Sequence, residues 1–299
     1  QKDGLLDQSF ASAGVRRLYF PDDAPALSSL APSPSAGSSG RSALTPSGKL
    51  VSSWWYTSHG RTVTFRLDEH GQLDPTFNKV GYVVLSTLLR NGSVSATLML
   101  ASGKVLVAGS FVDDSRRSRP FLVRYTDDGQ LDVGFGQNGI VTLDQHIGAS
   151  LNQWIETPDG ALAGFGRTAN DTSLVVMLHG DGRPDTSFQN NPVMDVWQWL
   201  NGTTDGGKLI AVGHTANPHD TMVARYLQNG ALDPDFANGS GWVRDDLSDH
   251  AEDDMPFDAK VTEGRTLIAG TRTVSGTYQA FVARKVMPEP KNNRCSGLL

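Results

Sequence analysis

Cysteine is almost missing from this chain of 299 residues, since Cys295 in the polar tail is the single one. No disulfide can form within the chain, and a cysteine-based zinc site is not expected. No stretch approaches the roughly 20 apolar residues that a membrane-spanning helix needs. Helical signals are missing too, because no run of Ala, Leu, Glu and Lys repeats its apolar residues every 3.6 positions or so.

Positive charge is sparse and dispersed. Lys and Arg number 26 against 32 Asp and Glu, the net charge is −6, and charged residues make up 19% of the chain. A phosphate backbone requires a concentrated basic face, whereas these basic residues are scattered along the sequence. We therefore expect no nucleic-acid partner.

Glycine is abundant, with 32 residues, and it belongs to a repeated pattern. A motif LDxxF, or a close variant, occurs at 6–10, 73–77, 131–135, 184–188 and 232–236. A glycine that ends a polar turn and precedes an apolar strand recurs as Gly48, Gly103, Gly160, Gly207 and Gly264. A third landmark closes a later strand, as in RYTDDG at 124–129. Three landmarks in fixed order indicate five copies of one structural unit.

Each copy reads as four β-strands. In the second copy the strands are expected at 94–100, 104–111, 121–126 and 139–144. Short apolar runs separated by glycine turns are typical of all-β arrays, and four strands per repeat match β-propeller blades. We predict an all-β fold: one five-bladed β-propeller of four-stranded blades over residues 1–286, with a flexible tail at 287–299.

The two ends of the chain predict how this ring closes. The last copy ends at 281–286 without an LDxxF motif or a fourth strand, and the missing piece stands at 1–20. We expect the N-terminal strand to complete the fifth blade beside the last strand. Such closure pairs exposed strand edges and allows a monomer.

The chain resembles the delta-60 repeat family, whose propeller-like repeats occur in secreted or surface proteins of bacteria. The resemblance is carried by segments 102–111, 121–143, 205–213 and 222–236. The resemblance implies a propeller and export to the periplasm, the cell surface or the medium, and it brings no catalytic motif. The chain starts at Gln1 without an apolar leader, which fits a mature exported protein and a trimmed chain equally well.

The recurrent Asp and Phe of the LDxxF motif are expected to serve the scaffold. The Asp can bond nearby backbone N–H groups and fix the connection to the fourth strand, and the Phe can fill the space between blades. These residues are Asp7, Asp74, Asp132, Asp185 and Asp233, with Phe10, Phe77, Phe135, Phe188 and Phe236.

One face of the propeller is expected to carry the ligand site. The second-to-third and fourth-to-first strand connections share this face, called the first face below, and they differ in every repeat. Binding residues concentrate on variable loops held by a rigid scaffold. Residues 21–40, rich in Pro, Ser and Ala, would add a long loop to the same face. The candidate ligand-binding residues are Trp197, Trp199, Asn152, His219, Asp253 and Asp254.

Plainer interpretations compete with each candidate. The two Trp rings could stack on a sugar, although packing between blades is favoured. The acidic run at 245–254 could hold Ca²⁺, but its spacing matches neither an EF-hand nor an RTX repeat, so a solvated loop is favoured and no metal or cofactor is expected. His59, His146, His219 and His250 share no ligand spacing, and most are expected to be exposed polar residues.

Two functions of different class follow. The first is a non-catalytic, exported binding or interaction module with a protein or glycan ligand on the first face. The alternative is a carbohydrate-active hydrolase that uses carboxylates at the channel mouth. The chain has no GxSxG, HExxH or P-loop motif, which favours the binding module and leaves the catalytic residues unknown. A purely structural module of a larger surface protein is also open.

Overall fold

The computed structural model describes residues 5–18, 20, 40–56, 61–85, 92–193, 195–247, 252–262 and 265–286. Residues 21–39 of the predicted first-face loop and the whole predicted tail at 287–299 lie outside these ranges. The chain forms two compact units, residues 1–148 and 149–299. Within the described ranges no helix is long and apolar enough to cross a membrane.

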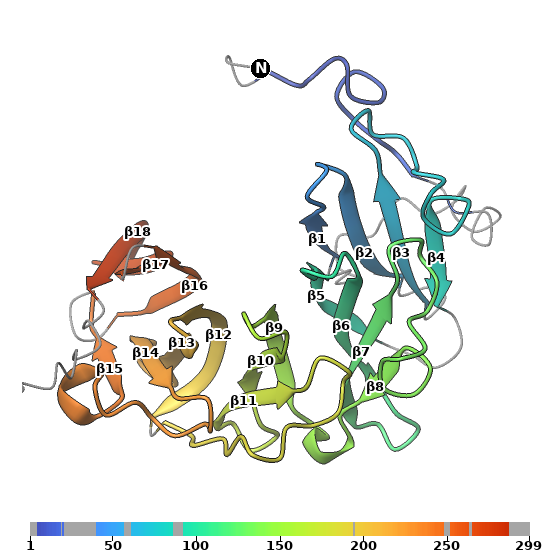
Figure 1. The fold of residues 1–299 in the computed structure, drawn as a ribbon. Helices are drawn as coiled ribbons and strands as arrows, with labels where there is room; N and C mark the ends of the chain where they lie inside the picture. Colours follow the sequence, from blue (N-terminus) through green and yellow to red (C-terminus); the bar gives the residue numbers. More distant parts are fainter. Residues whose placement is uncertain are drawn as a thin grey trace, which may run out of the picture. The chain divides into compact units, whose positions relative to one another are not determined.

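The first unit contains two four-stranded antiparallel sheets (Figure 1). One sheet has the order β1 (Gly40–Leu44), β2 (Leu50–Tyr56), β3 (Arg61–Leu67) and β4 (Tyr82–Leu85). The other has the order β5 (Ser93–Met99), β6 (Val105–Val112), β7 (Ser118–Tyr125) and β8 (Ile140–Thr142). A 3-10 turn, η2, follows at Asp144–His146. Within each sheet every strand pairs with the strand next to it in sequence, as in a propeller blade.

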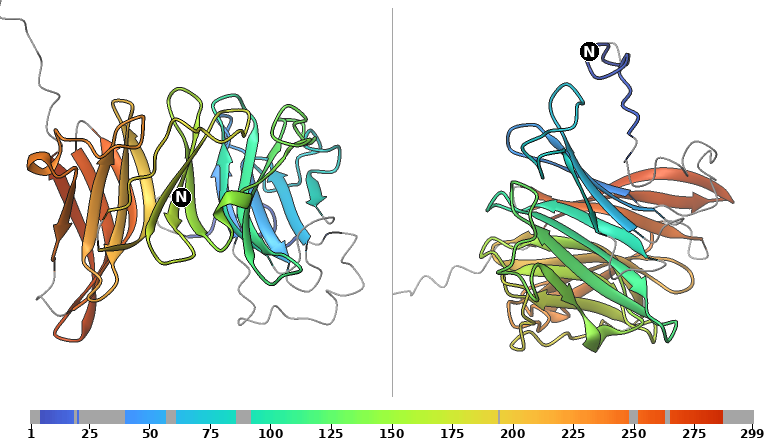
Figure 2. Two further views of the ribbon diagram at one scale, coloured as in Figure 1. Left: turned by 90° about the horizontal axis from the view of Figure 1, so that it is seen from below. Right: turned by 90° about the vertical axis from the view of Figure 1, so that its right-hand side faces the viewer.

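The second unit contains three antiparallel sheets, of which Figure 2 gives further views. The first has β9 (Ser150–Glu156), β10 (Leu162–Arg167) and β11 (Ser173–Leu178). The second has β12 (Val196–Asp205), β13 (Lys208–Thr215), β14 (Thr221–Tyr226) and β15 (Trp242–Asp245), with the 3-10 turn η3 at Ala237–Gly239. The third has β16 (Asp254–Thr262), β17 (Arg265–Val274) and β18 (Thr277–Val286).

Among the described residues the five predicted copies therefore correspond to five sheets, but four strands in every copy are not confirmed. The sheet of β16, β17 and β18 has three strands, in keeping with the absence of an LDxxF motif after it. The sheet of β9, β10 and β11 also has three, because residues 189–193, where its fourth strand was expected, run without strand structure.

Apolar side chains from neighbouring sheets of one unit pack together. In the first unit Trp55 of β2, Val107 of β6 and Tyr125 of β7 belong to one buried cluster with Phe77. Two of the recurrent Phe residues have the predicted role, since the buried Phe77 and Phe236 each pack among apolar side chains of two neighbouring sheets. These clusters hold the sheets of a unit against one another through apolar burial.

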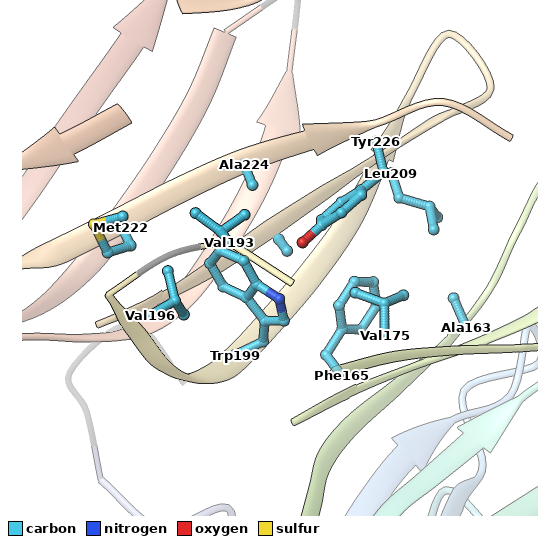
Figure 3. Close-up of a cluster of buried hydrophobic side chains, with 11 residues drawn as sticks. Ala163, Phe165, Val175, Val193, Val196, Trp199, Leu209, Met222, Ala224 and Tyr226 are labelled. Atoms are coloured by element: carbon cyan, nitrogen blue, oxygen red, sulfur yellow. The ribbon is translucent and has the colours of Figure 1, made fainter. Parts of the chain in front are cut away.

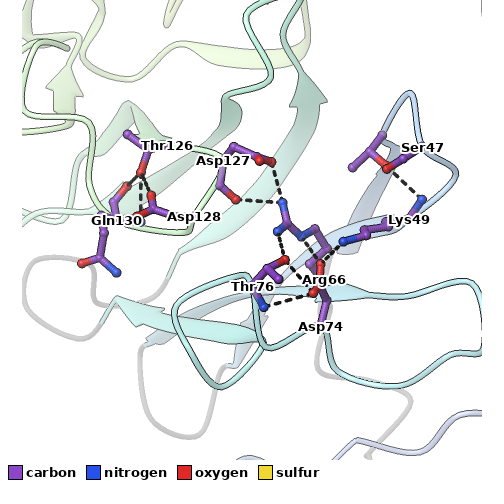
Figure 4. Close-up of polar contacts among 10 residues, drawn as sticks. Ser47, Lys49, Arg66, Asp74, Thr76, Thr126, Asp127, Asp128 and Gln130 are labelled. Atoms are coloured by element: carbon purple, nitrogen blue, oxygen red, sulfur yellow. Dashed lines mark hydrogen bonds and ion pairs between the residues drawn. The ribbon is translucent and has the colours of Figure 1, made fainter.

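The recurrent Asp anchors a buried ion pair (Figure 4). Asp74 accepts hydrogen bonds at Oδ1 from the backbone N and hydroxyl of Thr76, and Oδ2 pairs with Arg66 Nε at 2.7 Å and Lys49 Nζ at 2.8 Å. Arg66 also reaches Asp127, which lies on the next sheet's turn, at 2.6 Å. The Asp thus caps its own turn, as predicted, and neutralises a buried Arg, which its recurrence alone did not reveal.

The same arrangement recurs in two more sheets. Asp132 pairs with Arg124 and Lys104, and Asp233 pairs with Arg225 and Lys208, all at 2.5 to 2.8 Å. The sheet of β9, β10 and β11 departs from it, because Met177 and Ala161 stand at the positions of the Arg and the Lys. Asp185 keeps the turn bonds to Ser187, at 2.9 and 2.6 Å.

The N-terminal segment has the local geometry of a turn that leads to a fourth strand. Asp7 Oδ1 accepts from the backbone N and hydroxyl of Ser9, and Gly14 N donates to Phe10 O, just as Gly81 N donates to Phe77 O. The Phe10 ring lies against Gly71 of the first sheet, and a Cβ at Gly71 would approach it to 2.6 Å. Residues 5–14 therefore occupy, beside the first sheet, the place of the end of a preceding blade.

Candidate ligand-binding site

A recurrent backbone irregularity shapes the first strand of four sheets. The register shifts by one residue in the pairing of β5, β9, β12 and β16 with their neighbours. The second strand approaches so closely at each bulge that a Cβ there would lie 1.9 to 2.1 Å from a carbonyl oxygen of the first strand, so glycine is required. These glycines are Gly109, Gly166, Gly213 and Gly270.

Strand β12 carries a second, additional bulge at Trp197. Val196 pairs with Thr215 and Gln198 pairs with His214, so Trp197 has no partner on β13. A bulge re-aims the side chain of the extra residue. Trp197 and Trp199 therefore differ in environment although they stand two residues apart, where a regular strand would place them on one face.

Trp199 points into the core of the second unit (Figure 3). Its ring is 0% exposed and meets Tyr226 edge to face, with ring centres 6.4 Å apart. A ring so enclosed offers no face to a ligand, so the packing interpretation holds and Trp199 is removed from the candidate site. Asn152 also serves the scaffold, since its side-chain amide donates to Trp199 O at 2.8 Å and ties β9 to β12.

Trp197 is half-buried and lies beside one guanidinium group and two imidazole rings. The Arg167 guanidinium at the end of β10 stands 4.4 Å from the ring centre. The rings of His214 and His219 have their centres 5.4 and 6.3 Å from that of Trp197. A cation over an indole face is an attractive arrangement that also fixes the orientation of the indole.

The two histidines are held in different ways. His214 is fully buried, burial lowers the pKa of its imidazole, and its Nδ1 lies 2.7 Å from Thr215 O. The neutral ring thus donates from Nδ1 and accepts at Nε2 from the Gln198 amide, 3.1 Å away. His219 is partly exposed, and its Nδ1 lies 2.9 Å from Asp253 Oδ1. The predicted residues His219 and Asp253 therefore belong together, at the edge of the Trp197 cluster.

A pocket of about 330 Å³ opens beside Trp197 within the second unit. Its apolar lining comes from Val193, Val196 and Pro192, next to the indole. Asp171 and Asp195 supply exposed carboxylates, and Asp171 Oδ1 is bonded to Arg167 at 2.5 Å. An aromatic ring, apolar side chains and a few polar groups are the usual lining of a small-molecule site.

Asp254 belongs to a second group, of three carboxylates. Oxygens of Asp220, Asp246 and Asp254 lie within 4.8 Å of one another. Asp254 is 0% exposed and its Oδ2 accepts from Leu247 N at 2.5 Å, so the predicted solvated loop is wrong for this residue. Asp249 and His250 of the acidic run, and His59 of another loop, lie outside the described residues.

Sequence reasoning missed Arg167, His214 and Asp220. Each lies in or beside a strand that reads as ordinary scaffold, and no motif joins them to Trp197 or to the acidic run. Only the pairing of β12, β13 and β14, with its bulges, and the packing of β10 against β12 bring them together.

The family described as "Domain of unknown function (DUF5122) beta-propeller" matches residues 100–135 and 207–236, which confirms the prediction of a β-propeller repeat and leaves the delta-60 name a prediction. No curated protein matches this chain.

Solved structures give distant similarity. A protein of unknown function from Dyadobacter fermentans is 12% identical with a TM-score of 0.47, over 83% of this chain and 76% of that one. Exo-β-1,3-galactanases from Phanerochaete chrysosporium and Clostridium thermocellum are 10% and 13% identical, with TM-scores of 0.42 and 0.39. This chain spans 59% and 58% of their lengths, with 82% of this chain covered in both comparisons. Similarity at this level transfers no activity.

Proposed function

We propose that the protein is a non-catalytic glycan-binding module whose ligand occupies the pocket beside Trp197. The observation that carries the proposal is the second bulge of β12, which takes one indole out of the core and places it at a pocket on the predicted first face. The first-face loop between β10 and β11 contributes Asp171 and Thr172 to the lining.

The shape and chemistry of the pocket favour a sugar over a protein partner. A volume of about 330 Å³ is at the lower end of small-molecule sites, whereas a protein partner would need roughly 800 Å² of contact surface on each side. Sugars present C–H faces that stack on an indole and hydroxyls that bond to carboxylates such as Asp195.

A glycan array followed by titration calorimetry of the best ligand tests this proposal. We expect Trp197→Ala to weaken binding at least tenfold, equivalent to about 1.4 kcal/mol. Trp54→Ala is the matched control, because Trp54 is 40% exposed on β2 of the other unit and should leave affinity unchanged. Absence of binding to every glycan, or equal losses in both variants, would contradict the proposal. Hydrolysis products in the same samples would favour the alternative, a carbohydrate-active hydrolase.

We further propose that the chain forms one monomeric, exported five-bladed propeller in which residues 5–14 complete the sheet of β16, β17 and β18. Arg284 stands in β18 at the repeat position of Arg66, Arg124 and Arg225, and Asp7 stands at the position of their Asp partners. Export would place the protein in the periplasmic, surface or secreted fraction of its cells.

Charge reversal separates this closure from the local packing of residues 5–20. Arg284→Glu should lower the unfolding temperature, and adding Asp7→Lys should restore part of the loss, because the exchanged charges attract again. Additive effects of the two substitutions would contradict the closure. Deleting residues 1–20 would be less informative, since Phe20 is buried against Phe65 in the first unit and its loss destabilises that unit in any case.

A further inference from the structure

A carboxylate site lies apart from the Trp197 pocket. Asp220 precedes β14, Asp246 follows β15 and Asp254 begins β16, so three chain segments bring their oxygens within 4.8 Å of one another. Asp220 and Asp254 are 2% and 0% exposed, while Asp246 is exposed. Two enclosed carboxylates beside a third require positive charge in their surroundings, because an uncompensated buried charge is strongly destabilising.

The protein supplies only part of this compensation at Asp220. Its Oδ2 receives the guanidinium of Arg244, with Nε at 2.5 Å. Its Oδ1 is buried and has no hydrogen-bond partner in the part of the chain that the structure describes. Buried carboxylate oxygens are almost always bonded, so an unbonded oxygen on a buried member of this group of three acids indicates a missing ligand.

We infer that Asp220, Asp246 and Asp254 bind a hard divalent cation, with Ca²⁺ preferred over Mg²⁺. Three carboxylates supplied by the protein suit Ca²⁺, which takes about six to eight oxygen ligands in a flexible geometry. Mg²⁺ keeps several of its waters and is usually held by one or two carboxylates.

Cation binding would add to the bonds that already join these three segments. Asp254 N donates to His219 O at 2.5 Å, and His219 N donates to Asp253 Oδ1 at 3.1 Å. The cation would therefore stabilise the approach of β16 to the connection before β14. This role does not depend on a glycan ligand and stands if the proposed function fails.

The test measures cation binding by the whole chain after chelation and dialysis. We expect CaCl₂ at 100 times its dissociation constant to raise the unfolding temperature by about 5 °C or more, and calorimetry to show one site with weaker binding of MgCl₂. Asp246→Asn, in an exposed residue that should not impair folding, is expected to weaken Ca²⁺ binding at least tenfold. Asp245→Asn is the matched control, because the neighbouring Asp245 is paired with Lys285 at 2.5 Å.

The inference fails if Ca²⁺ neither shifts the unfolding temperature nor gives a binding isotherm with the unmodified chain. It also fails if Asp246→Asn and Asp245→Asn bind Ca²⁺ equally well, since binding would then lie elsewhere. Asp220→Asn provides a second reading: its unfolding temperature should no longer respond to Ca²⁺, whatever its value in the absence of the cation.

Discussion

The buried ion pair between Arg225 and Asp233 is expected to be a large local contribution to stability. The two side chains are 3% and 1% exposed, and Arg225 Nε lies 2.5 Å from Asp233 Oδ2. Asp233→Asn keeps the shape of the side chain and an oxygen for the bond from Asp235 N, but it removes the charge that neutralises Arg225. Leaving one partner of a buried pair uncompensated costs about 3 to 5 kcal/mol, a large fraction of the roughly 5 to 15 kcal/mol that stabilises a typical domain.

Asp185→Asn is the matched control for this prediction. Asp185 occupies the same motif position, and its backbone N bonds to Met177 O at 2.9 Å just as Asp233 N bonds to Arg225 O at 2.8 Å. Because Asp185 caps a turn and neutralises no buried Arg at the recurrent position, its loss should cost less than about 1 kcal/mol. Urea unfolding followed by circular dichroism measures both free energies. A cost below about 1 kcal/mol for Asp233→Asn, or equal costs for the two variants, would refute the reasoning.

Two further predictions follow from the scaffold. Burial by itself would raise the pKa of the Asp132 and Asp233 carboxyls, but hydrogen bonds from Lys104 and Lys208 and the adjacent Arg charges hold both pKa values below the ordinary range. The stability from these groups is therefore fully present above the unfolded-state pKa of about 3.9 and is lost as pH falls through the lower folded-state pKa. Unfolding temperatures measured from pH 6 to pH 2 should drop below about pH 4, and Asp233→Asn should flatten the drop; an unchanged slope would contradict this. Gly213→Ala should destabilise the second unit by about 2 kcal/mol or more, because its Cβ would lie 2.0 Å from Gln198 O, whereas Gly134→Ala, with its nearest neighbour at 3.6 Å, should be nearly neutral by the same urea assay.

Local patterns made the scaffold predictable from the sequence. Each LDxxF motif combines a turn-capping Asp with a buried or partly buried Phe, and each polar turn ends in a glycine, so the repeat could be recognised without knowledge of long-range contacts. The absence of a strand at 189–193 was not predicted, although the sequence there, QNNPV, contains a Pro that cannot donate a ladder hydrogen bond.

The candidate sites were less predictable, since they depend on pairing between strands. Trp197 and Trp199 look equivalent in the sequence, and the bulge that separates them is a property of the register between β12 and β13. His214 lies inside a strand, and Asp220 and Asp254 are distant in sequence, so their burial next to other polar groups could not be inferred from spacing. The acidic run drew attention to the right segment, but it did not reveal which carboxylates are enclosed.

The sheet of β9, β10 and β11 has a consequence for local opening. It lacks both a fourth strand and the Arg and Lys that brace the recurrent Asp elsewhere, so it should be among the cooperative units that open at the lowest free energy. The loop between β10 and β11 also forms one wall of the pocket. A ligand that binds only the closed state would slow amide hydrogen exchange in this sheet, and part of its binding free energy would offset the cost of keeping the sheet closed.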